Sequence, residues 1–63
     1  MNYNEVALEI AQIIDNKNIE SGFVRDLAIL DCIKKFGIEP TSITGQGIQK
    51  DVEIILSKMT WQA

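Results

Sequence analysis

The sequence predicts an all-α fold, a small bundle of three helices in a single domain that spans residues 1–63. Three stretches repeat apolar side chains at the spacing of one helix face, and two segments of turn-forming residues separate them. Hydrophobic residues make up 46% of the chain and charged residues 24%, which is the balance of a folded domain and not of a disordered one.

The first predicted helix runs from about Tyr3 to Asp15. Its apolar stripe falls at i, i+4, i+7 and i+8 and consists of Val6, Ile10, Ile13 and Ile14. Asn2 is suited to cap the start of this helix, with Glu5 three residues later as in a capping box. The polar residues 15–18 predict the turn that follows.

The second predicted helix is the longest and the central one, from about Ile19 to Phe36. Its end is clearly signalled, because Gly37 can take the left-handed conformation and Pro40 prevents continuation. We expect Ile38 to fold back on Ile33 there, as in a Schellman motif.

This second helix is apolar on nearly every side, which is typical of a buried helix. One stripe contains Phe23, Leu27 and Leu30, and another contains Ile29, Ile33 and Phe36. Two neighbouring helices cannot cover both, and eleven of the 63 residues are Ile. Domains of this size often rely on self-association, since their cores leave only about 3–5 kcal/mol of net stability. We therefore predict a homodimer or higher oligomer that completes the bundle, with Ile29, Ile33 and Phe36 at the interface.

The third predicted helix runs from about Gln46 to Thr60, and Gly45 and Gly47 both weaken helix formation at its start. Its core stripe consists of Ile48, Val52, Ile55, Leu56 and Met59.

A candidate partner-binding site lies on the other side of this third helix. Ile54 and Trp61 are seven residues apart there, and Lys50 and Lys58 flank them. Large apolar side chains among polar residues are typical of interaction sites, and Trp is enriched where binding energy is concentrated.

Composition removes several classes of function. The chain has no His and one Cys, so it cannot build the common zinc sites, and we predict no metal, no cofactor and no catalytic residues. Cys32 lies among aliphatic residues, which indicates a small buried side chain. The net charge of -3 argues against a strongly basic nucleic-acid binder. No apolar run approaches the ~18 residues that span a bilayer, and a lone free cysteine favours the cytoplasm.

These observations predict a non-enzymatic, acidic regulatory or accessory factor that binds another protein through an apolar helical surface. The alternative is a dimeric nucleic-acid-binding transcriptional regulator, since a short turn joins the first two helices as in a helix-turn-helix. In that case Glu20 and Asp26 would face phosphates with only Arg25 to offset them.

A third interpretation comes from residues 34–39, Lys-Lys-Phe-Gly-Ile-Glu, which end the second predicted helix. This segment resembles the end of the second helix in acyl carrier proteins, which are also small, acidic and helical. The resemblance implies a carrier that holds its prosthetic group on Ser21. The family has Asp before that serine and Leu or Met after it, where this chain has Glu20 and Gly22.

Overall fold

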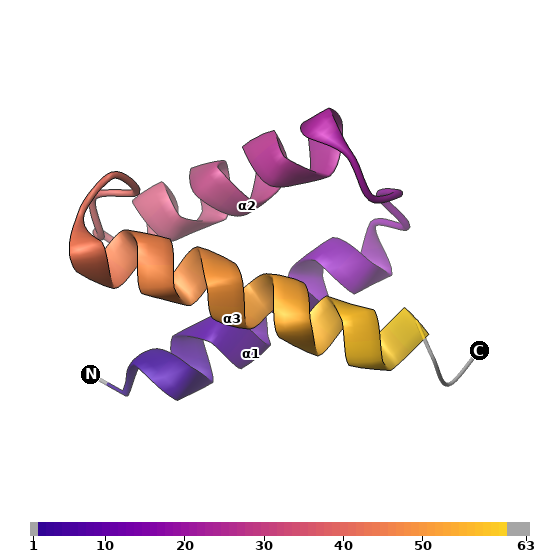
Figure 1. Cartoon of the computed structure of the whole chain (residues 1–63), viewed down its shortest axis with the longest axis horizontal. Coiled ribbons are helices and arrows are strands. Elements are labelled where there is room, and N and C mark those ends of the chain that lie inside the picture. Colours follow the sequence, from indigo (N-terminus) through magenta and orange to yellow (C-terminus); the bar gives the residue numbers. More distant parts are fainter. Residues whose placement is uncertain (1, 61–63) are drawn as a thin grey trace.

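The computed structural model describes residues 2–60 and contains three helices, α1 (Tyr3–Asn16), α2 (Phe23–Lys35) and α3 (Ile43–Thr60). Within that part of the chain there is no strand, so the predicted all-α fold is confirmed. The helices form a compact globule of 31 × 22 × 16 Å. In Figure 1, α1 and α3 run in the same general direction and cross each other. The helix between them in the chain, α2, runs in the opposite direction and covers one side of this pair. The most extensive packing is between α1 and α3.

The first helix begins where the sequence predicts. The side-chain oxygen of Asn2 accepts a hydrogen bond from the backbone N–H of Asn4 at 3.0 Å, which satisfies one of the free donors of the first turn. The helix ends at Asn16, and Asn18 then adopts a φ of +54°. Asn tolerates this left-handed conformation better than most residues, so the chain turns here.

The second helix differs from the prediction, because it is the shortest of the three and not the longest. It has 13 residues and begins at Phe23, four residues after Ile19. Gly22 precedes it with a φ of +134°, a backbone conformation that helices do not use, and supplies no side-chain cap. The segment 19–22 is therefore part of the connection from α1, and α3 with 18 residues is the longest helix.

The end of α2 is a Schellman motif, as predicted. The backbone N–H of Ile38 donates to the carbonyl oxygen of Ile33 at 3.3 Å, and that of Gly37 donates to Lys34 at 2.9 Å. Gly37 holds the left-handed φ of +81° that this motif requires.

The third helix begins at Ile43, three residues earlier than predicted, and includes both glycines. Ser42 caps it, since its hydroxyl oxygen accepts from the N–H of Gly45 at 2.9 Å and donates to the carbonyl oxygen of Glu39 at 2.6 Å. A Cβ at position 45 would overlap that carbonyl oxygen and lie 2.8 Å from the Cα of Pro40. Gly45 is thus needed for close packing of α3 against the preceding loop.

The core is formed by aliphatic side chains from all three helices. Its fully buried large members are Ile10, Ile14, Ile29, Ile33, Ile48 and Val52. Cys32 is also buried, as a free thiol within this apolar cluster.

This core requires a correction to the predicted oligomer interface. Ile29 and Ile33 are 0% exposed in a single chain, and Phe36 is half-buried against the same core. The reason is the orientation of α2, which turns the stripe of Ile29 and Ile33 toward the other helices. The large apolar side chains of α2 that stay exposed are Phe23, Val24 and Leu27, near its start.

Candidate interaction surfaces

All three helices carry exposed apolar side chains that the core does not use. On α3 the inward stripe contains Ile48, Val52 and Leu56, and Ile54 lies roughly 200° around the helix from Val52. Its side chain is 44% exposed. Lys50 and Lys58 are one helical turn on either side of it.

These residues line a shallow groove of about 300 Å³, which we call the α3 outer face and which consists of Lys50, Glu53, Ile54, Ser57 and Lys58. The structure thus brings together three of the four predicted partner-binding residues, with Ile54 at the centre and the two lysines at the rim. The fourth, Trp61, lies outside the described residues.

One edge of this groove holds a pair of carboxyl groups that the sequence does not reveal. Glu53 of α3 makes a side-chain hydrogen bond with Asp26 of α2. Partial burial raises the pKa of Glu53, the hydrogen bond and the negative charge of Asp26 raise it further, and the positive charge of Arg25 lowers it. The pairing depends on the rotation of α2 against α3, so no spacing in the sequence could have predicted it.

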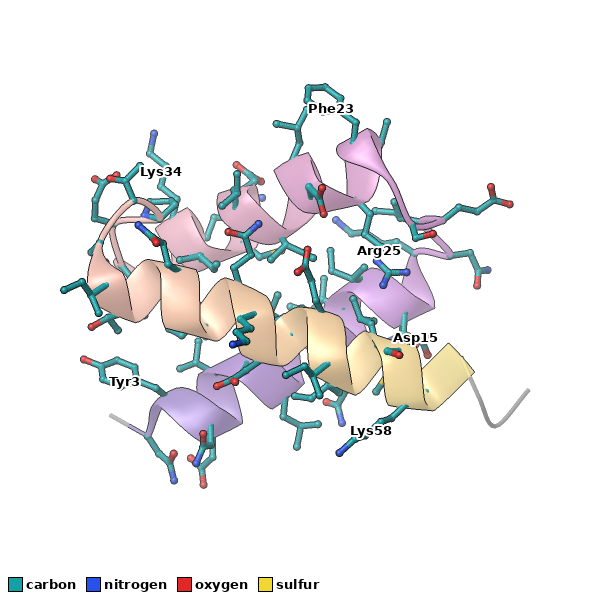
Figure 2. The ribbon with its side chains drawn as sticks, in the orientation of Figure 1. Tyr3, Asp15, Phe23, Arg25, Lys34 and Lys58 are labelled. Carbon is teal, nitrogen blue, oxygen red and sulfur yellow. The ribbon has the colours of Figure 1, made fainter. Side chains whose placement is uncertain are left out.

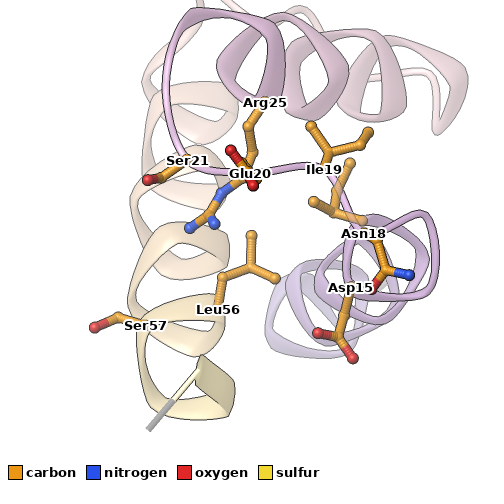
Figure 3. A pocket seen from close by; sticks show the side chains of 9 residues that line it. Asp15, Asn18, Ile19, Glu20, Ser21, Arg25, Leu56 and Ser57 are labelled. Carbon is orange, nitrogen blue, oxygen red and sulfur yellow. The ribbon is translucent and has the colours of Figure 1, made fainter. Parts of the chain in front are cut away.

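A larger cleft of about 750 Å³ lies at the end of the bundle where α1 ends and α2 begins (Figure 3). Its lining residues are Ile14, Asp15, Asn18, Ile19, Glu20, Ser21, Arg25, Leu56 and Ser57. The cleft combines an aliphatic floor with hydroxyl, carboxylate and guanidinium groups. Its hydroxyls have no imidazole beside them, because the chain contains no His, so it lacks the base of a serine hydrolase site. The sequence did not predict this cleft, because much of its wall is formed by residues 18–21 of the connection from α1 to α2, whose path depends on Gly22.

The exposed side of α2 is apolar near the start of the helix and charged near its end. We call Phe23, Val24 and Leu27 the α2 outer face, and they are 75%, 68% and 49% exposed. Beyond them the same side of the helix is charged, and Lys35 pairs with Asp31 at 3.1 Å. Figure 2 shows Phe23 and Lys34 both projecting away from the other helices, at opposite ends of α2.

Two further findings concern sites of other kinds. Within residues 2–60, no three side chains of His, Cys, Asp or Glu are grouped so that they could hold a metal ion. None of the helices in the same range has the length and apolar character needed to span a membrane.

Comparison with protein-family models, with curated proteins and with solved structures finds no match to this chain.

Proposed function

We propose that this protein is a non-enzymatic, acidic accessory or regulatory factor that binds another protein through the α3 outer face. The observation that carries the proposal is the exposed side chain of Ile54, set in a groove between Lys50 and Lys58. An apolar centre with a charged rim is the usual anatomy of a protein interface.

The charges around Ile54 indicate the kind of partner. Two lysines rim the groove, with the single carboxyl group of Glu53 between them. We therefore expect a partner that presents an apolar side chain or pocket bordered by carboxylates. The rim charges would increase the association rate more than the affinity.

A cytoplasmic location is part of the same proposal. Cys32 is a free, buried thiol, and unpaired cysteines are usual in reducing compartments.

The alternative of nucleic-acid binding has less support in the geometry. The first residues of a recognition helix contact base edges, and here these positions hold Phe23 and Val24, both strongly exposed and apolar. A gel shift with duplex DNA at low and moderate salt distinguishes the two functions, because binding through phosphates weakens steeply with salt. Intact mass tests the carrier interpretation, since a prosthetic group on Ser21 would add a discrete increment.

The protein-binding proposal is tested by affinity capture from the source cell with two matched variants. Ile54→Asp changes the centre of the α3 outer face, and Leu8→Asp changes a residue of α1 that is also 44% exposed. The proposal expects a protein captured by the wild type and by Leu8→Asp but lost with Ile54→Asp. Equal capture by all three proteins would contradict it.

A further inference from the structure

We infer that the cleft at the end of the bundle, which we call the end cleft, binds a small linear zwitterion with an ammonium group and a carboxylate at the two ends of a short aliphatic chain. Its volume of about 750 Å³ exceeds that of the groove on the α3 outer face and is typical of small-molecule sites. The end of α1, the connection to α2, the start of α2 and the second half of α3 all contribute to its lining. The inference does not depend on the proposed function.

Arg25 supplies the positive charge of the end cleft. Its side chain is half-buried, and within residues 2–60 it forms no ion pair, although Asp15 and Glu20 line the same cleft. Its charge lowers the pKa of Glu53 on α3 without a direct ion pair between the two. A guanidinium presents its donors in a planar fork that matches a carboxylate. Arg25 is therefore suited to bind the carboxylate of a ligand.

Asp15 lies across the opening from Arg25. In Figure 3, the guanidinium of Arg25 lies on the side of α3, and Asp15 projects from α1 on the other side. The side chain of Leu56 lies between them in this view. A ligand with its two charges at opposite ends of a chain can thus place its carboxylate at Arg25 and its ammonium group at Asp15.

The charges of the lining disfavour simple ions. The carboxylates of Asp15 and Glu20 outnumber the single guanidinium of Arg25, so a simple anion would be repelled by two groups and attracted by one. A simple cation would leave Arg25 without a counter-charge. A zwitterion brings the opposite charge to both sides of the cleft, and this difference is the basis of its selection.

The aliphatic part of the lining consists of Ile14, Ile19 and Leu56. Ile14 and Leu56 are buried, and Ile19 is half-buried against the same core. These residues offer a floor on which a slender methylene chain can lie, but little of their apolar area is left to cover. We therefore expect the charges to decide which ligand binds.

An NMR titration of the isotope-labelled protein tests the ligand class with four compounds. The compound ε-aminocaproate has both charges at the ends of its chain, caproate lacks the ammonium group, hexylamine lacks the carboxylate, and glycine has its two charges close together. We expect ε-aminocaproate to shift the amides of Asp15, Ile19 and Arg25 and to bind about threefold or more tighter than each of the others. No binding of ε-aminocaproate, or equally tight binding of any other compound, would overturn the inference.

Two variants test which residue holds which charge. Arg25→Gln should weaken the binding of ε-aminocaproate about threefold or more but not that of hexylamine, which has no carboxylate. Asp15→Asn should weaken ε-aminocaproate similarly but not caproate, which has no ammonium group. Lys34→Gln and Glu9→Gln make the same charge changes at exposed positions outside the cleft lining and are the controls. Losses that ignore the charge of the ligand, or that occur in the controls, would overturn the inference in variants that circular dichroism shows to be folded.

Glu20 tests the orientation of the ligand. In Figure 3 its side chain lies on the same side of the opening as Arg25, so its charge opposes the ligand carboxylate and not the ammonium group. Glu20→Gln should therefore bind ε-aminocaproate at least as tightly as the wild type does. Loss of binding in Glu20→Gln, with none in Asp15→Asn, would overturn the assignment of the ammonium group to Asp15.

Discussion

Asp26 of α2 and Glu53 of α3 bring two carboxyl groups together, and partial burial, side-chain hydrogen bonding with Asp26 and the negative charge of Asp26 all raise the pKa of Glu53. This contact links two helices that otherwise meet through the aliphatic core. It makes the folded state hold a proton on Glu53 more tightly than the unfolded chain does, since the pKa of Glu53 is raised. The corresponding stability is present below the ordinary Glu pKa of about 4.3 and is lost as the pH rises through the folded value.

We therefore expect Glu53→Gln to increase the free energy of unfolding at neutral pH. The amide keeps a hydrogen bond with Asp26 and removes the repulsion between two carboxylates. The gain should be less than about 1 kcal/mol, because the pair is open to solvent, and it should shrink as the pH falls below 4.3. Urea unfolding at neutral and acidic pH measures it. Glu9→Gln, on the exposed side of α1, is the control. A gain that is the same at both pH values would argue against the carboxyl pair.

The two glycines of α3 should respond in opposite directions to the same substitution. Gly47→Ala should stabilise the protein by about 1 kcal/mol, because Ala favours helix and a Cβ there meets nothing within 4 Å. Gly45→Ala should destabilise it, since its Cβ would overlap the Glu39 carbonyl oxygen. Thermal unfolding of the two variants gives the comparison. Similar gains in both would mean that the loop does not pack against α3 at Gly45.

The burial of Ile33 is tested by small deletions at two positions of α2. Ile33→Val removes one methylene from the core and should lower the free energy of unfolding by about 0.5–1.5 kcal/mol. Val24→Ala removes more of the side chain but should have little effect at low protein concentration, because Val24 is 68% exposed. Chemical denaturation of dilute samples measures both. A larger loss at Val24 would mean that α2 is turned the other way.

Local signals in the sequence were enough to predict the ends of some helices. Asn2 and Gly37 act through contacts within a few residues, so the N-terminal cap and the Schellman motif could be read from the chain. The length of α2 could not, because a glycine within an apolar stretch is compatible with a helix, and only the structure shows the φ of +134° at Gly22. At Gly45 the sequence predicted that the helix had not yet begun, whereas this glycine lies within α3 and allows close packing against residues 39 and 40.

The part of the candidate site that lies on one helix could be predicted from the sequence, because it depends only on local spacing. The exposure of Ile54 follows from helical periodicity against the core stripe of α3, and Lys50 and Lys58 follow from their spacing. The apolar face of α2 that remains open depends on how the helix is rotated in the bundle. Periodicity identified the stripes of Phe23 and of Ile29 but could not decide which one faces the core. The Asp26–Glu53 pair and the end cleft likewise depend on tertiary packing.

The most direct test of protein binding through the α3 outer face is an NMR titration. Isotope-labelled protein would be titrated with a partner recovered by the affinity capture described above, and the amide shifts would be mapped along the chain. We predict that the largest changes cluster at Lys50, Glu53, Ile54, Ser57 and Lys58 and are absent in Ile54→Asp. Changes confined to the α2 outer face or to the end cleft, with the α3 outer face unaffected, would contradict this account.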